Sequence, residues 1–192
     1  IQEMVADFAQ KEVAPIAAEI DENHRFPTEL WSKIVEVGLP GIPFPEGLGG
    51  SNSSTLAYVL AVEELSKVCG STGLTFAAHV SLGTYPIYRW GGADLAREYV
   101  PRLISGEYMG AYALTEPGAG SDASSMQSSG VVCHGRYKGE EVLGIRLDWN
   151  KRYITLAPVA TVLGLAFNTY DPDGLLGGET DLGISCALIP VS

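Results

Sequence analysis

Hydrophobic residues in the first part of the chain recur every three or four positions, which is the spacing of one face of an amphipathic helix. Residues 1–20 carry such a face, and a second one begins after Pro27 and ends at Gly38. Proline suits the first turn of a helix and glycine its end, so both residues mark boundaries. The same spacing predicts further helices over residues 55–68, over 74–90 and from Asp94 to about Leu103.

Two of these predicted helices carry more specific expectations. In the helix over 55–68, the residues expected to face inward are Leu56, Val59, Leu60 and Leu65. In the helix over 74–90, Pro86 removes one backbone hydrogen bond. A kink is therefore predicted near Ser81 and Leu82.

After Gly106 the helical period gives way to short runs rich in β-forming residues. Strands are predicted over residues 108–115, 130–137, 142–147, 152–156, 161–168 and 183–191. The predicted fold class is therefore α+β. We expect an N-terminal all-α helical bundle in residues 1–109 and an antiparallel β-barrel-like domain in residues 110–192.

The composition limits the classes of partner. The 192 residues include 23 acidic and 12 basic side chains, a formal net charge of −11, which argues against nucleic acid or an anionic membrane surface. No apolar run reaches ~18 residues, so no membrane span is expected. The three cysteines are far apart and in no metal-binding spacing, so no metal site is expected.

One stretch, residues 111–122, has the sequence A-Y-A-L-T-E-P-G-A-G-S-D. Its first half contains β-formers, whereas Pro117 and the glycines after it must turn. Small residues from Gly118 to Ser121 would let backbone N–H groups approach an anion closely. Composition alone leaves open a plain surface turn, and neither the P-loop nor the G-x-G-x-x-G fingerprint is present.

The pattern Y-x-L-T-E-P-x-A-G-S-D in this stretch resembles the flavin-binding signature of the acyl-CoA dehydrogenase family. Downstream, Lys151-Arg152-Tyr153-Ile154-Thr155 resembles the family's K-x-[WF]-I-T strand, with Tyr153 where Trp or Phe is usual. Residues 1–127 resemble the short- and medium-chain branch. The later segments, such as E-V-L-G-I-R-L, resemble the bacterial long-chain branch.

This resemblance implies flavin-dependent α,β-dehydrogenation of an acyl-CoA thioester, with FAD as cofactor and an electron-transferring flavoprotein as electron acceptor. It also implies a role in fatty acid β-oxidation, a homo-oligomer in the full-length form, and a cytoplasmic location in bacteria or a mitochondrial-matrix location in eukaryotes. The implied cofactor-binding residues are Tyr112, Ala113, Leu114, Thr115, Glu116, Pro117, Gly118, Ala119, Gly120, Ser121, Tyr153, Ile154 and Thr155. Ser121 is also the implied substrate-binding residue.

The resemblance assigns individual roles within this set. The Leu114 backbone and Thr115 would bind the pyrimidine edge of the flavin, and Thr155 the N5 side, while Tyr153 would pack against the flat face of the ring. Because both threonines must reach one ring, we expect Thr115 and Thr155 to end neighbouring strands.

The family's C-terminal helical domain, which supplies the catalytic Glu, has no counterpart after Gly110 in this sequence. We therefore expect no catalytic base in the chain, no dehydrogenation by it alone, and weak or absent retention of FAD. We also expect Glu116 to be held by local hydrogen bonds. Two alternatives stay open. One is an acyl-CoA oxidase or flavin monooxygenase on the same fold, and the other is a non-catalytic acyl-CoA- or flavin-binding domain.

Overall fold

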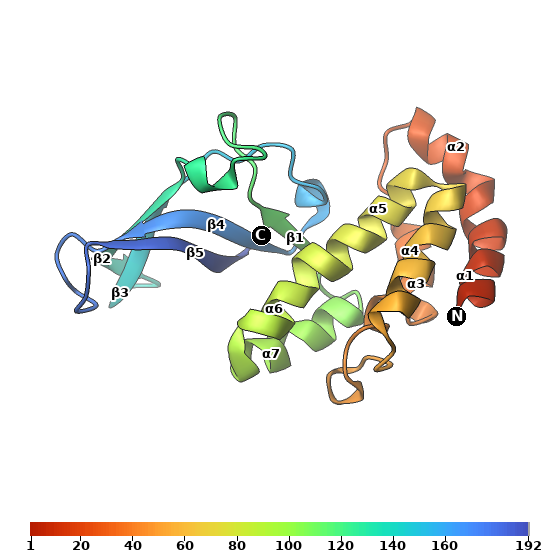
Figure 1. Cartoon of the computed structure of the whole chain (residues 1–192), viewed down its shortest axis with the longest axis horizontal. Coiled ribbons are helices and arrows are strands. Elements are labelled where there is room, and N and C mark those ends of the chain that lie inside the picture. The colour runs from red at the N-terminus through yellow and green to blue at the C-terminus, as the bar shows by residue number, and fades with distance from the viewer. Residues whose placement is uncertain (192) are drawn as a thin grey trace. The chain divides into compact units, whose positions relative to one another are not determined.

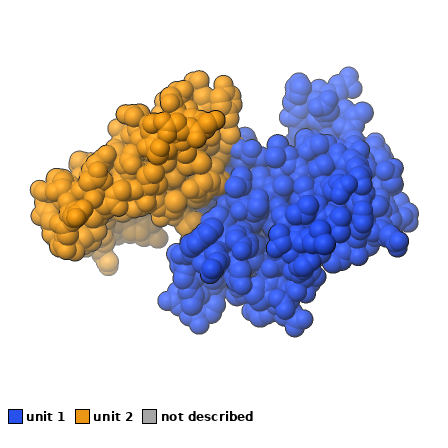
Figure 2. All heavy atoms as spheres, in the orientation of Figure 1, with its two compact units in different colours: residues 1–111, 155–162, 191–192 blue, residues 112–154, 163–190 orange. Residues whose placement is uncertain are grey.

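The computed structural model describes residues 1–191, which form two compact units (Figure 2). The helical unit comprises residues 1–111, 155–162 and 191, and the sheet unit comprises residues 112–154 and 163–190. Residues 155–162 therefore group with the helices, although the sequence pattern assigns them to the β domain. Each unit is described by itself.

Seven α-helices lie in the described part of the helical unit (Figure 1). They are α1 (Gln2–Phe8), α2 (Ala14–Glu22), α3 (Thr28–Glu36), α4 (Thr55–Val68), α5 (Gly70–Ala78), α6 (Tyr85–Trp90) and α7 (Gly92–Ile104). The loop before α4 contains two short 3₁₀ turns. The Oγ of Ser54 accepts the amide hydrogen of Ala57 at 3.2 Å, so a capped first turn fixes the start of α4 where the sequence predicts it.

Two π-helical segments interrupt the helices, Ala9–Val13 between α1 and α2 and His79–Thr84 between α5 and α6. A proline follows each segment closely, Pro15 in the first case and Pro86 in the second. Proline has no N–H to donate to the carbonyl four residues earlier, so a widened turn accommodates it without ending the helix. The position predicted for a kink, near Ser81 and Leu82, lies inside the second π segment.

The core of the helical unit is apolar and well filled. Its fully buried side chains include Leu30, Ile34, Leu39, Phe44, Leu65, Phe76 and Leu103. The predicted inward face of α4 is wrong in part, because Leu56 is 66% exposed and Val59 is 50% exposed. Leu65 is buried as predicted, and Ala61, which the prediction did not include, is buried as well. This helix has apolar residues on more than one face, so spacing alone does not identify the buried one.

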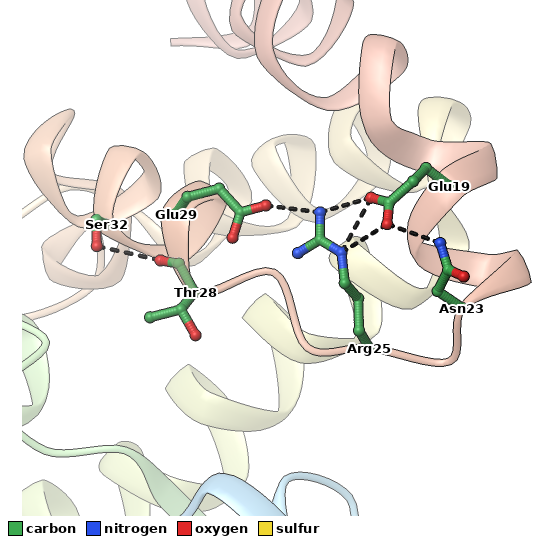
Figure 3. Close-up of polar contacts among 6 residues, drawn as sticks. All are labelled: Glu19, Asn23, Arg25, Thr28, Glu29 and Ser32. Atoms are coloured by element: carbon green, nitrogen blue, oxygen red, sulfur yellow. Dashed lines mark hydrogen bonds and ion pairs between the residues drawn. The ribbon is translucent and has the colours of Figure 1, made fainter.

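A small polar network holds the turn between α2 and α3 (Figure 3). The guanidinium of Arg25 contacts the Glu19 carboxylate at 2.5 Å and the Glu29 carboxylate at 2.7 Å. The amide of Asn23 donates to Glu19 at 2.9 Å. These groups are largely exposed, so each pair contributes little stability and mainly fixes the path of the chain.

The strands form one five-stranded sheet in the order β1-β4-β2-β3, with β5 paired to β4. They are β1 (Gly110–Ala113), β2 (Ser129–Tyr137), β3 (Glu140–Asp148), β4 (Val162–Tyr170) and β5 (Asp181–Pro190). The predicted α+β class is confirmed. The antiparallel prediction needs correction: β2 and β3 are antiparallel, but β2 runs parallel to β4 from Ser129 opposite Asn168.

The strand predicted over residues 152–156 is wrong. This segment is irregular, and both Tyr153 (φ 58°) and Leu156 (φ 69°) have left-handed backbone conformations that cannot continue a strand. A short 3₁₀ turn, Ala157–Val159, follows it.

Within residues 1–191 we find no helix long and apolar enough to cross a membrane, and no cluster of side chains arranged to hold a metal ion.

Candidate functional site

The segment that follows β1 makes a tight turn at Pro117 and Gly118. The Glu116 amide donates to the Ala119 carbonyl at 3.0 Å, and the Ala119 amide donates back to the Glu116 carbonyl at 3.2 Å. The Ala119 N–H therefore closes the turn and is not available to an anion. Gly118, Gly120 and Ser121 are exposed beside it.

The glycines of this turn are not required by the packing of the chain itself. Gly118 and Gly120 do not have a positive φ, and a Cβ added to either would meet nothing within 4 Å. Gly130, by contrast, packs so tightly that an added Cβ would lie 2.6 Å from the Phe167 ring. The small residues at 118 and 120 thus leave open space, which a bound molecule could fill.

A buried cluster anchors the turn to the sheet. Ala119 and Met126 pack against Ala166 of β4, and the partly buried Tyr112 and Leu114 pack onto this cluster. The phenol of Tyr112 also lies 3.5 Å from the Cys186 thiol of β5. Burial and this contact raise the pKa of Tyr112 to about 12, so its hydroxyl stays protonated.

Glu116 is a buried carboxylate, only 6% exposed, with its hydrogen-bonding capacity taken up by neighbours. It accepts from the Gln127 amide at 2.6 Å, from the Ser128 amide at 3.0 Å and from the Lys151 ammonium at 2.7 Å. Burial acts to raise its pKa, but the bonds from Lys151, Ser128 and Gln127 prevail and lower it to about 2. Glu116 is held by hydrogen bonds, but the prediction that they are local is wrong, because the donors to its carboxylate lie 11, 12 and 35 residues away.

Lys151 joins the two sequence motifs. Its side chain is only 1% exposed, and its ammonium donates both to Glu116 and, at 3.0 Å, to the Leu114 carbonyl. Beside it, the Arg152 amide donates to the Thr115 carbonyl at 2.9 Å. The segments 114–119 and 151–152 therefore lie side by side. The predicted site set omits Lys151, although its place at the start of the second motif was a usable signal.

A cleft of about 320 Å³ opens next to the turn, within the sheet unit. It is lined by Glu116, Pro117, Gly118, Gln127, Ser128, Asp148, Trp149 and Asn150. The Trp149 side chain at its edge is 44% exposed. The buried Ser128 Oγ has no hydrogen-bond partner among the described residues. This cleft adds residues after β3 that the motifs do not include.

The structure brings most of the predicted residues into one unit, but not all. Residues 112–121 and 153–154 belong to the sheet unit, whereas Thr155 groups with the helical unit. Tyr153 is 85% exposed, so the chain itself does not cover its ring. The prediction that Thr115 and Thr155 end neighbouring strands is wrong: β1 stops at Ala113, and Thr155 lies in a turn.

Residues 1–107 match the family model described as "Acyl-CoA dehydrogenase, N-terminal domain". A Bacillus subtilis protein described as "Probable acyl-CoA dehydrogenase YngJ" is 43% identical over 175 residues, which is 91% of this chain and 44% of that protein.

Two solved structures show the same fold over nearly all of this chain. One, described as the electron transferring flavoprotein of Acidaminococcus fermentans, has a TM-score of 0.84 and 36% identity, covering 99% of this chain and 46% of that one. The other is an acyl-CoA dehydrogenase from Bacillus anthracis in complex with FAD. It has a TM-score of 0.81 and 29% identity over 98% of this chain and 30% of that one. The chain thus spans less than half the length of these proteins.

Proposed function

Because the chain belongs to the acyl-CoA dehydrogenase family, we propose that residues 112–155 form the flavin-binding part of an enzyme that dehydrogenates an acyl-CoA thioester. The cofactor in this proposal is FAD, and the electron acceptor is an electron-transferring flavoprotein. The observation that carries it is the buried Lys151–Glu116 pair, which binds the two flavin-like motifs to each other.

The residues present are compatible with a large planar cofactor. Open space lies over Gly118 and Gly120, and the Tyr153 ring is exposed and free to stack on a flat surface. Thr115 lies at the end of the anchored segment, where the Arg152 amide holds its backbone carbonyl. An anchored backbone segment and an exposed aromatic ring are what a flavin ring needs on its edge and on its face.

When bound, FAD would accept the β-hydrogen of the substrate as hydride, after loss of the α-proton. The Leu114 backbone and Thr115 would bind the edge of the ring where negative charge develops on reduction. Thr155 would bind the opposite side, and Tyr153 would shield one face from water. The exposed Ser121 hydroxyl would contact the phosphates or the CoA chain.

We propose that the carboxylate that removes the α-proton lies outside these residues. A general base must be free to approach the proton and needs a pKa near the working pH. Glu116 meets neither condition, because three donors occupy its oxygens and its pKa is about 2. In this proposal Glu116 positions the turn and does not take part in proton transfer.

A flavin titration of the purified chain tests the proposal. We expect added FAD to bind weakly, with a change in flavin absorbance, and the Glu116→Gln variant to bind more weakly still. We expect no bleaching of the bound flavin by any acyl-CoA under anaerobic conditions. Failure of the unmodified chain to bind FAD at any concentration of added FAD would overturn the flavin assignment. Bleaching by an acyl-CoA that disappears in Glu116→Gln would show that Glu116 is the base after all.

A further inference from the structure

The Lys151 ammonium makes a second contact that the ion pair does not require, a 3.0 Å hydrogen bond to the Leu114 carbonyl. That carbonyl belongs to the peptide group whose N–H is carried by Thr115. Among residues 1–191 we find no hydrogen-bond acceptor for the Thr115 N–H. One end of this peptide is therefore bound to a buried cation, while its other end has no partner within the chain.

A cation bound to a peptide oxygen draws electron density toward that oxygen. The N–H of the same peptide becomes a stronger donor, because hydrogen bonds in a chain polarise one another. The effect is large only where solvent does not screen the charge, and the Lys151 side chain is 1% exposed. The Leu114–Thr115 peptide is also held in place, by Leu114 packing in the buried cluster and by the Arg152 amide on the Thr115 carbonyl.

We propose that Lys151 is a positioning residue that polarises the Leu114–Thr115 peptide and thereby strengthens the Thr115 N–H as a donor to the pyrimidine edge of the flavin. This inference rests on the proposed function, since it assigns the ligand of that N–H. Glu116 accepts a hydrogen bond from the same ammonium at 2.7 Å and holds it in place, so the pair does more than join two loops. Negative charge on the reduced ring is then stabilised by a lysine that does not contact the ring.

The proposal predicts a shift in flavin redox equilibrium. Lys151→Met removes the cation, so the bound flavin should favour its reduced form about tenfold less, which corresponds to about 30 mV for a two-electron couple. Lys151→Arg keeps a buried cationic donor, so its flavin potential should stay close to that of the unmodified protein. Lys138→Met, at an exposed lysine of the same unit, is the matched control and should leave the potential unchanged.

A second measurement needs no flavin and covers the case in which Lys151→Met disturbs the loop. In amide NMR spectra of the chain alone, Lys151→Met should move the Thr115 amide resonance upfield. Lys151→Arg should largely keep that resonance in place, because it retains a buried cation beside the Leu114 carbonyl. A purely structural role would make the two variants alike.

The outcomes separate the two proposals. An unchanged Thr115 resonance in a folded Lys151→Met variant, or an unchanged flavin potential, would overturn the assignment to Lys151. If the unmodified chain binds no flavin, the proposed function and the flavin part of this inference fail together. The NMR comparison still decides whether Lys151 polarises the peptide.

Discussion

The Nε2 atom of His79 lies 2.9 Å from the carbonyl oxygen of Leu103, while its Nδ1 atom accepts the amide hydrogen of Gly110 at 3.3 Å. Both ring nitrogens are thus used by the neutral imidazole, with the proton on Nε2. The ring is fully buried and packs edge-on against Trp31. A second proton on Nδ1 would break the bond to Gly110 and place a charge in the core.

The first prediction is that the helical unit loses stability below neutral pH because of His79. Burial lowers the pKa of His79 to about 4, although the Leu103 carbonyl acts to raise it. The unfolded chain, with an ordinary histidine pKa near 6.5, takes up the proton first, so stability is complete above that pH and is lost as the pH falls toward 4. We expect a loss of about 2 kcal/mol between pH 7 and pH 5 in urea unfolding.

His79→Gln should flatten this pH dependence, whereas the matched variant His134→Gln, at an exposed position of β2, should retain it. Equal slopes in all three proteins would show that His79 is not the group responsible.

The second prediction concerns the close approach of Gly83 and Gly110. A Cβ added to Gly83 would lie 2.7 Å from the Gly110 backbone, which cannot move aside as a flexible side chain could. Gly83→Ala should therefore lower the free energy of unfolding by about 1–3 kcal/mol. Gly70→Ala, where an added Cβ meets nothing within 4 Å, should change it by no more than about 1 kcal/mol. Chemical denaturation of both variants makes the comparison. An unchanged free energy of unfolding in Gly83→Ala would contradict the observed packing.

The third prediction separates folding from ligand binding at the turn. Gly118→Ala and Gly120→Ala should each change the unfolding free energy by less than about 0.5 kcal/mol, because the added methyl meets no chain atom. Each should weaken FAD binding about tenfold or more if the cofactor occupies that space. Gly144→Ala in β3, equally unhindered, is the control for the flavin titration. Unaltered flavin affinity in all three variants would show that the cofactor does not bind at this turn.

The fourth prediction tests Thr155 despite its place outside a strand. Loss of one hydrogen bond to the ring, about 1 kcal/mol, should weaken FAD binding roughly fivefold in Thr155→Val. Thr161 would be a poor control, since its hydroxyl accepts the Met109 amide at 2.9 Å and its loss would disturb folding. The exposed Thr180 is better matched, and Thr180→Val should bind FAD normally. Equal FAD affinities for Thr155→Val and Thr180→Val would show that Thr155 does not bind the flavin.

Sequence reasoning succeeded where local signals and tertiary packing agree. The bounds of α4 follow from its continuous helical period, with which the Ser54 cap seen in the structure agrees, and the strands around Gly130 and Val142 follow from their composition. It failed at Tyr153-Ile154-Thr155, whose β-forming side chains suggest a strand. There the burial of Lys151 against Glu116 and Leu114 sets the path of the backbone. A local sequence pattern cannot predict the contact between Lys151 and Glu116, because the two residues are 35 positions apart.

Parts of the candidate site were also predictable from the sequence, and other parts were not. The turn at Pro117 and Gly118 can be read from the residues themselves. The partner of Glu116 cannot, because a lysine in a polar stretch is expected to be exposed. The cleft beside Trp149 and Asn150 was also missed, since it depends on where the end of β3 meets the turn.

The chain passes from one compact unit to the other four times, after residues 111, 154, 162 and 190. A protease cut at any one of these crossings would not release a complete unit, because each unit needs pieces from distant parts of the sequence. Gene truncation near residue 110 would likewise leave the helices without residues 155–162, in which Thr161 binds the Met109 amide and carbonyl. Recombination between relatives should therefore be tolerated only where all the interleaved pieces are exchanged together.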